Sequence, residues 1–194
     1  MQMMKQSAKE IKNLKIMVLC ALLIAIALVV EILNPLNTSS YLKVSFSFIP
    51  LALIGYFSGP VTGIYVGLLY DIINFMFSKD GTSFVPLYTL LEMLGLFIYG
   101  LLLYRKNRMW VKKPLLDVIL KCTLAKTCIN IFVNSLGNSF LNIYLYGVAK
   151  HGIWLYIFPR IIKNITLLPA EIAVLVIIIY YVKNQKTFSV WLNK

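Results

Sequence analysis

Asparagine recurs at every fourth position in one apolar stretch of the chain. The series consists of Asn130, Asn134, Asn138 and Asn142, and Lys126 begins it one step earlier. If the stretch is helical, residues four apart lie on nearly one face, so their side chains form a polar stripe. Unpaired amides are costly in hydrocarbon, so a stripe in a membrane must face other helices or a wet cavity. Two interpretations stay open: hydrogen bonds that hold helices together, or one wall of a binding site.

Ionisable side chains also lie inside apolar segments of the sequence. Those that we consider for a site are Asp71, Glu92, Arg160 and Lys163. A charge is expensive to bury in lipid, so such residues indicate a functional site by default. Carboxylates and amides can form paired hydrogen bonds with a ring edge, whereas a guanidinium suits a carboxylate. Together with the asparagines they predict a polar pocket for one small solute.

Aromatic residues are expected at the same depth as these polar groups. Tyr41, Phe84, Tyr88 and Trp154 are the ones we consider as pocket residues. An interfacial belt of aromatic side chains would explain many of them. The alternative is that they stack on a flat ligand or close the pocket above it.

The sequence lacks the motifs of several classes of enzyme and metal site. The chain has no G-x-x-x-x-G-K-[S/T] nucleotide loop and no cluster of residues with metal-ligand spacing. Its one histidine, His151, has no serine or cysteine partner in a recognisable motif. We therefore expect no catalytic residues, no metal and no cofactor.

Composition places the chain in the membrane. Of its 194 residues 60% are hydrophobic, more than one soluble domain of this length could bury. The 19 Lys and Arg residues outnumber the 7 Asp and Glu residues. In so apolar a chain, this excess indicates orientation in the membrane rather than nucleic-acid binding.

The hydrophobic pattern predicts an all-α integral membrane protein, a single domain over 1–194. Its six transmembrane helices are expected at about 16–33, 44–57, 61–77, 86–104, 114–146 and 155–182. Pro50 would bend the second helix, and Ser58, Gly59 and Pro60 would form a turn after it. The basic segments, which are the N-terminal lead, 105–113 and 183–194, then share one side, so both termini are cytoplasmic. The pocket would face outward, covered by loops 34–43 and 78–85.

Three stretches together carry a family resemblance. They are Ala21-x-x-x-Ala25 in the first helix, "KVSFSFIPLALIGYFSGPVTGIYVGLLYDIINFMF" and "FPRIIKNITLLPAEI". With them the chain resembles the substrate-capture (S) component of energy-coupling factor (ECF) vitamin transporters, most closely the folate-specific one. One run departs from that subgroup: where it tends to have Phe-Pro-Gly-Phe-Thr-Leu-Ser-Ala, this chain has Val-Pro-Leu-Tyr-Thr-Leu-Leu-Glu at 85–92.

The resemblance implies a vitamin-capture subunit in a prokaryotic plasma membrane. Such a subunit binds its vitamin from outside and docks on a membrane scaffold protein coupled to two cytoplasmic ATPases. The small residues Ala21 and Ala25 would form the docking surface, since they let another helix approach closely. It would bind no nucleic acid and have no ATPase motif or enzyme activity of its own.

A folate-like ligand would divide the site residues into three groups. Its pterin edge would contact Asp71, Asn134 and Asn138, with Glu92 as an additional candidate; its ring would stack on the aromatic residues; its glutamate would bind Arg160 and Lys163. Thiamin, pantothenate or a pyridoxine-like compound are the alternative ligands. A structural membrane subunit without a ligand is the alternative from another class.

Overall fold

The computed structural model describes residues 2–33, 45–77, 84–107, 109–147 and 153–185. These residues form helices and no strand, in the order α1 (Gln2–Glu10), α2 (Leu14–Ile32), α3 (Phe48–Phe77), α4 (Pro86–Leu103), α5 (Pro114–Cys128), the π-helix η2 (Ile129–Gly137), α6 (Asn138–Tyr146) and α7 (Ile153–Asn184). Among the described helices, four are long and apolar enough to cross a membrane, in α2, α3, α4 and Ile157–Asn184 of α7. The all-helical membrane class predicted from the sequence is therefore confirmed.

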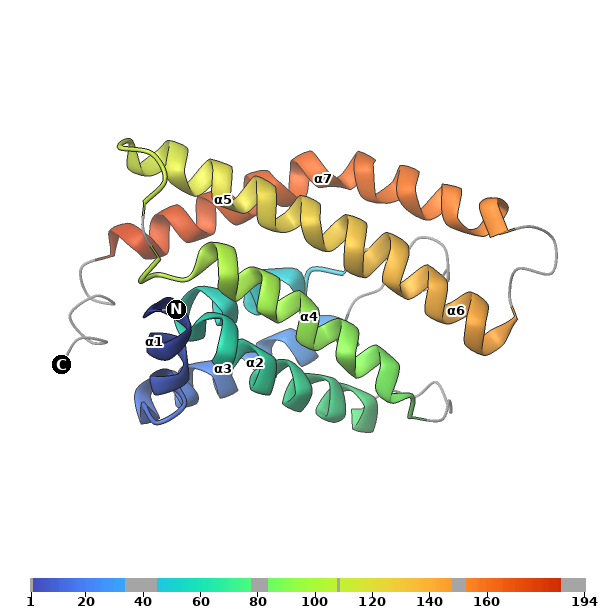
Figure 1. Ribbon diagram of the computed structural model, residues 1–194, viewed down its shortest axis with the longest axis horizontal. Helices are drawn as coiled ribbons and strands as arrows, with labels where there is room; N and C mark the ends of the chain where they lie inside the picture. Colours follow the sequence, from blue (N-terminus) through green and yellow to red (C-terminus); the bar gives the residue numbers. More distant parts are fainter. Residues whose placement is uncertain (1, 34–44, 78–83, 108, 148–152, 186–194) are drawn as a thin grey trace.

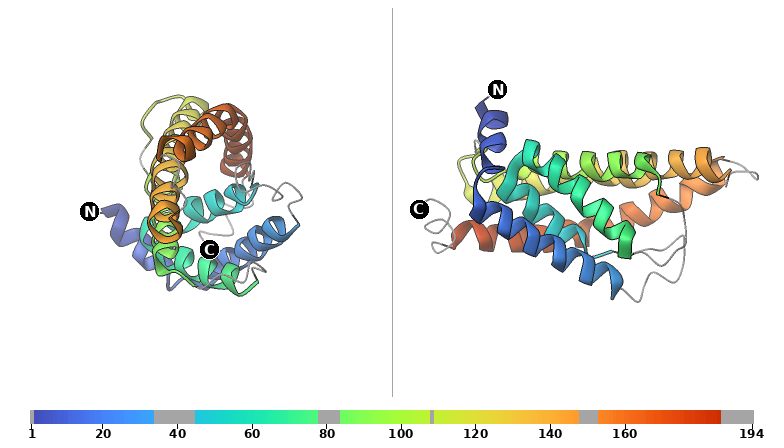
Figure 2. Two further views of the ribbon diagram at one scale, coloured as in Figure 1. Left: turned by 90° about the vertical axis from the view of Figure 1, so that its right-hand side faces the viewer. Right: turned by 90° about the horizontal axis from the view of Figure 1, so that it is seen from below.

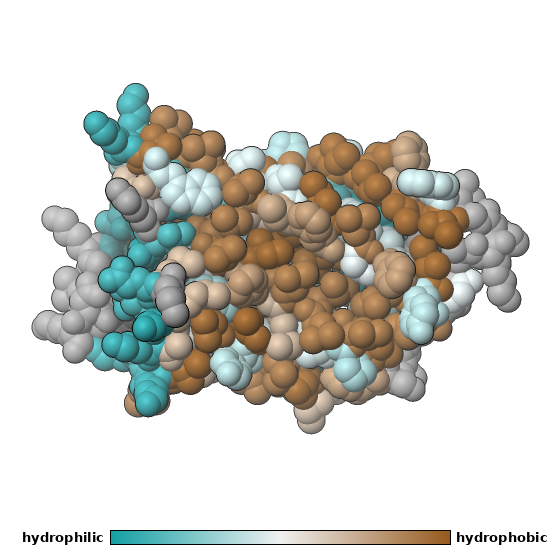
Figure 3. Space-filling view, in the orientation of Figure 1, coloured by the Kyte–Doolittle hydropathy of each residue, from teal (hydrophilic) through white to brown (hydrophobic). Residues whose placement is uncertain are grey.

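The long helices run along one common axis, and α1 lies across one end of the bundle (Figures 1 and 2). The continuous path of α5, η2 and α6 packs beside α7, whereas α3 packs mainly on α4 and α2. The first part of α3, cyan in Figure 2, lies inside the ring of the other helices. On the face seen in Figure 3, apolar side chains cover the length of the helices and hydrophilic ones gather at the α1 end. This pattern is typical of a bundle embedded in lipid with one polar end in water.

A kink divides α3 where the sequence predicts a turn between two helices. Gly59 has φ 76° and ψ −176°, a conformation that a residue with a Cβ rarely adopts. Pro60 then begins the second half of the helix, where its missing N–H costs nothing. Pro50, in contrast, lies in the first turn of α3, where no intrahelical N–H bond is required. The helix is therefore interrupted at Gly59, within the turn that the sequence predicts. The bend that we predicted at Pro50 is not seen.

Ser7 of α1 holds this kink from outside the helix. Its side chain is fully buried, and its hydroxyl donates to the carbonyl of Ser58 over 2.9 Å. The same oxygen accepts from the backbone N–H groups of Val61 at 2.9 Å and Thr62 at 3.2 Å. Thr62 Oγ1 also donates to the Ser7 carbonyl over 2.6 Å. Ser7 thus caps the second half of α3, although more than fifty residues separate it from that helix start.

Glu10 fixes the end of α1 to the connection that follows α4. Its carboxylate is buried and accepts from Tyr104 Oη at 3.0 Å, Arg105 Nη2 at 3.3 Å and Lys106 Nζ at 2.6 Å. Burial and the nearby Glu10 carboxylate raise the pKa of Tyr104, so its hydroxyl remains a donor. The basic lead that we predicted only as a charged segment is therefore a packed helix.

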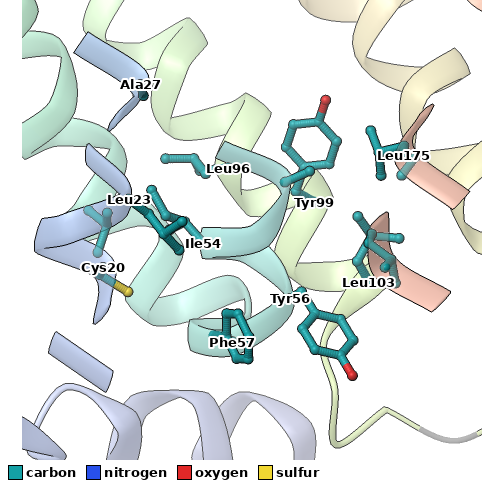
Figure 4. Packing of buried hydrophobic residues seen from close by; sticks show 14 of the residues in the cluster. Cys20, Leu23, Ala27, Ile54, Tyr56, Phe57, Leu96, Tyr99, Leu103 and Leu175 are labelled. Carbon is teal, nitrogen blue, oxygen red and sulfur yellow. The ribbon is translucent and has the colours of Figure 1, made fainter. Parts of the chain in front are cut away.

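The apolar core contains residues of α2, α3, α4, α5, η2 and α7, and Figure 4 shows part of it. Its labelled members are Cys20, Leu23, Ala27, Ile54, Tyr56, Phe57, Leu96, Tyr99, Leu103 and Leu175. At Gly100 the backbones of α4 and α3 approach so closely that a Cβ would lie 2.5 Å from the carbonyl carbon of Gly59. This close packing fixes the positions of α3 and α4, both of which contribute to the site described next.

Candidate functional site

A cavity of about 390 Å³ lies between the long helices. Residues from α2, α3, α4, α7 and the α5–η2–α6 path line it, as do Ser45 and Ser47 just before α3. Charged groups of both signs are part of its wall: Glu31, Glu92, Lys126, Arg160, Lys163 and Glu171. A cavity of this size with a few convergent polar groups is typical of a small-molecule site.

The asparagine stripe forms one side of this cavity. Asn134, Asn138 and Asn142 line it, whereas Asn130 is buried below them. Asn134 Nδ2 donates to Asn130 Oδ1 over 2.9 Å, and Asn142 Nδ2 donates to the Asn138 carbonyl over 2.6 Å. The stripe runs through the π-helix Ile129–Gly137, a rare element that frequently occurs at functional sites. Asn130 thus bonds to a neighbouring helix through Glu171, whereas Asn134, Asn138 and Asn142 line the cavity; that they bind a ligand stays a prediction.

An ion pair occupies the inner end of the stripe. Lys126 is buried, and its Nζ lies 3.3 Å from Glu171 Oε1 of α7. The same ammonium lies 3.9 Å from the ring centroid of Phe48, a cation–π distance. Asn130 Nδ2 donates to Glu171 Oε2 over 3.0 Å. The salt bridge to Glu171, the Asn130 hydrogen bond and the contact with the Phe48 ring therefore hold one another in place, which keeps this part of the polar wall in a single arrangement.

The wall contributed by α2 and the start of α3 carries a second polar group. Ser45 donates a short hydrogen bond to the carboxylate of Glu31, and its Oγ lies 2.6 Å from Ser47 Oγ. Tyr99 of α4 lines the cavity too, and its buried hydroxyl has no hydrogen-bond partner among the described residues. A buried hydroxyl without a partner is costly, so a ligand that pairs with Tyr99 would gain affinity.

The basic residues predicted in the last long helix do line the cavity. Arg160 and Lys163 are half-buried there, next to Asn164, whose Nδ2 donates to Ser135 Oγ over 2.8 Å. They lie on α7, which packs beside the α5–η2–α6 path that carries the asparagine stripe. The described site thus combines cationic, anionic and amide groups in the wall of one cavity.

Other predicted site residues lie elsewhere. Asp71 accepts from Thr89 Oγ1 over 2.6 Å, which ties α3 to α4 and directs its carboxylate to a neighbouring helix. Phe84 packs edge-on against Phe75, with 5.2 Å between ring centroids. Neither Asp71 nor Phe84 lines the cavity.

The two remaining described aromatics are also outside the lining. Tyr88 donates from its hydroxyl to Asn142 Oδ1 over 3.1 Å, so it supports the wall from behind. Trp154, at the start of α7, is 79% exposed. Tyr41, the predicted covering loop 34–43 and residues 78–83 of the predicted covering loop 78–85 lie outside the described residues.

Residues that our sequence argument did not choose complete the lining. Glu31, Lys126 and Glu171 are charged, and Tyr70 and Tyr99 are aromatic. The signal for the charged ones was present, since each is an ionisable residue in or next to an apolar run. Their pairing depends on contacts between helices that are far apart in sequence.

The predicted docking residues lie on the surface of the bundle. Ala21 and Ala25 are exposed on α2, whereas Ala27, on the opposite side of the same helix, is completely buried. Among the described residues no group of three or more His, Cys, Asp or Glu side chains could hold a metal ion.

Comparisons with known proteins agree on one family. A family model described as "ECF transporter, substrate-specific component" matches residues 15–180. A protein of Streptococcus mutans named "Folate transporter FolT" is 30% identical over 162 residues, which are 79% of this chain and 84% of that protein. A Mycoplasma pneumoniae protein, "Uncharacterized protein MG313 homolog", is 34% identical over 93 residues, and this chain spans only 32% of its length.

A solved structure has the same fold. The crystal structure of FolT bound with folic acid superposes with a TM-score of 0.70 and 26% sequence identity, covering 88% of this chain and 93% of that one.

Proposed function

This chain belongs to the substrate-specific components of ECF transporters, and we propose that within this family it captures folate. Its relative in Streptococcus mutans is named a folate transporter, and the solved FolT structure of the same fold contains folic acid. The observation that carries the proposal is the charged and amide-lined cavity of about 390 Å³ in this fold. Its volume lies within the roughly 300–1,000 Å³ of sites for drug-sized ligands.

The two kinds of polar group in the cavity match the two ends of folate. Arg160 and Lys163 would bind the anionic glutamate portion, with Arg160 forming a forked pair of hydrogen bonds. Asn134, Asn138 and Glu92 would bind the pterin edge, which offers donors and acceptors in one plane. Asp71 is a weaker candidate for this edge than the sequence suggested, because it does not line the cavity and its Oδ2 accepts from Thr89.

Aromatic side chains of the inner wall would stack on the flat ring. Phe48, Tyr70 and Tyr99 line the cavity, and an offset or edge-on contact with a pterin would add to the affinity. The unpartnered hydroxyl of Tyr99 would supply one further hydrogen bond. Phe84, Tyr88 and Trp154 do not line the cavity, so they are weaker candidates for stacking than these three residues.

Orientation is part of the proposal. We place the α1 end of the bundle and both termini in the cytoplasm, because the hydrophilic residues gather there (Figure 3), and the cavity opening outside. The two halves of α3, α2, α4, the α5–η2–α6 path and α7 would make six membrane crossings. The exposed Ala21 and Ala25 would dock on the scaffold subunit, which two ATPases drive.

A cationic vitamin such as thiamin is the second candidate. One observation favours it: three of the charged residues in the cavity wall are carboxylates, Glu31, Glu92 and Glu171. However, Glu171 already pairs with Lys126, and Ser45 donates to Glu31. Folate would also pair with the cationic residues Arg160 and Lys163, so it complements more of the charged groups in the cavity wall than thiamin does.

The decisive experiment identifies the ligand of the isolated subunit. The detergent-purified chain is examined by mass spectrometry for a copurified small molecule, and the ligand-free protein is titrated with folate, thiamin and pantothenate. We expect saturable binding of one folate and no displacement by excess thiamin. Saturable binding of thiamin alone would overturn the folate assignment, and no saturable binding of any vitamin would favour a structural subunit.

A further inference from the structure

A second cavity, of about 190 Å³, lies at the α1 end of the bundle, between the end of α4, the start of α5 and the end of α7. Its charged lining residues are Arg105, Lys121, Lys183 and Asp117. Three cations therefore face one carboxylate, which leaves a formal excess of two positive charges. The vitamin site uses none of these residues.

The single carboxylate of this cavity is already shared among several donors. Asp117 Oδ2 lies 3.0 Å from Lys121 Nζ and 3.5 Å from Lys183 Nζ. Its other oxygen, Oδ1, accepts from the backbone N–H of Trp110 at 2.7 Å. Asp117 is almost completely buried, at 1% exposure. One buried carboxylate therefore serves two ammonium groups, so positive charge exceeds negative charge among the residues that line this cavity.

Arg105 has a similar excess of donors over acceptors. Its Nη2 lies 3.3 Å from Glu10 Oε1, which also accepts from Tyr104 and Lys106. The buried Nε of Arg105 has no hydrogen-bond partner among the described residues. An unsatisfied buried N–H costs free energy that an anionic acceptor would recover. Guanidinium groups favour phosphate oxygens because their planar fork matches the geometry of the phosphate.

The surroundings of the cavity place it where a lipid headgroup would lie. Trp110 is half-exposed beside it, and Lys121 Nζ lies 5.6 Å from the Trp110 ring centroid. Leu115, Leu116 and Leu120 expose apolar side chains on the adjoining start of α5. Tryptophan next to basic residues and exposed leucines is typical of the boundary between headgroups and acyl chains. Basic pockets between membrane helices on the cytoplasmic side bind anionic lipid headgroups.

We propose that this second cavity binds a phosphate group, held by Arg105, Lys121 and Lys183 and supplied by an anionic phospholipid of the membrane or by free phosphate. The phosphate oxygens accept from the three cations, and lipid chains would pack along the exposed leucines of α5. Because α4, α5 and α7 all contribute to the cavity, a bound phosphate would join these helices at one end of the bundle.

The test is native mass spectrometry of the full chain in detergent, titrated separately with dioleoylphosphatidylglycerol, dioleoylphosphatidylcholine and inorganic phosphate. Lys183→Gln removes one cation of the cavity, and its side chain is partly exposed, so folding should tolerate the change. Lys112→Gln removes an exposed lysine just before α5 and is the matched control. The thermal unfolding midpoint, measured without lipid, checks that each variant is folded.

We expect phosphatidylglycerol to bind the unchanged protein and Lys112→Gln alike, and to bind Lys183→Gln about fivefold or more weakly. Inorganic phosphate that also binds, and that is lost in Lys183→Gln, would assign the site to free phosphate. Lipid binding without phosphate binding would assign it to the headgroup. Equal affinity for both lipids, together with no phosphate binding, would overturn the proposal, as would an equal effect of the two substitutions.

Discussion

The cap that Ser7 provides for the second half of α3 makes a sharp prediction. Ser7→Ala removes one oxygen atom and leaves the backbone of α1 unchanged. The substitution abolishes the hydrogen bond to the Ser58 carbonyl and leaves the N–H groups of Val61 and Thr62 without their acceptor. Loss of a helix cap costs roughly 0.5–2 kcal/mol, and each buried polar group left unsatisfied costs about 1–3 kcal/mol.

Since one cap serves all these groups, we expect a total loss of about 2–3 kcal/mol in the free energy of unfolding. A protein of this length loses about 2–4 °C in Tm per kcal/mol. The thermal unfolding midpoint of the detergent-purified Ser7→Ala protein should therefore fall by about 4–12 °C.

A control variant and a binding measurement test whether the loss of stability comes from the cap. Thr166→Ala also removes a hydroxyl, which is exposed on α7 and, among the described residues, donates to the Ile162 carbonyl of its own helix. This control should change the stability by less than about 0.5 kcal/mol. Folate affinity should stay unchanged in Ser7→Ala, because Ser7 does not line the cavity. If Ser7→Ala and Thr166→Ala lower the Tm equally, Ser7 is not the cap of α3.

Three further predictions follow from other parts of the structure. Gly100→Ala should destabilise the protein by roughly 1–3 kcal/mol in thermal unfolding, because the new Cβ would lie 2.5 Å from the α3 backbone. Gly95→Ala on the same helix is the control: its Cβ meets nothing within 4 Å, so the substitution should be neutral or stabilising. Arg160→Ala should weaken folate binding about tenfold, equivalent to ~1.4 kcal/mol, in a titration; a change below about threefold would contradict the carboxylate contact. Ala21→Trp or Ala25→Trp should abolish vitamin uptake by cells and leave folate binding to the isolated subunit intact; normal uptake in both would exclude the docking role.

The sequence predicted several residues of the cavity lining, because some features depend on one helix alone. The asparagine series is a property of local periodicity, and three of its four members line the cavity. Arg160 and Lys163 were identified because charges are rare within apolar runs, and both line the cavity. The sequence also predicts the break at Gly59, because a glycine followed by proline typically marks a turn.

Other features depend on which helices meet, which spacing does not specify. We favoured Asp71 over Glu92 for the pterin edge, yet the structure pairs Asp71 with Thr89 and places Glu92, not Asp71, in the cavity wall. Lys126 and Glu171 are 45 positions apart in the chain, and only the packing of α5 on α7 brings them within 3.3 Å. The sequence likewise gave no sign that Ser7 would cap a distant helix.

The π-helix Ile129–Gly137 changes the direction in which the asparagines, spaced four residues apart, point. In a regular α-helix each residue turns by about 100°, so a step of four overshoots one turn by about 40°, and three such steps by about 120°. A stripe from Asn130 to Asn142 would then wind a third of the way around the helix. The wider turns of Ile129–Gly137 counteract this drift, so that Asn134, Asn138 and Asn142 all reach the same cavity. If the same residues were wound as an ordinary α-helix, Asn138 and Asn142 would be rotated away from the direction of Asn134, so here the irregular helix is what keeps the repeat in phase.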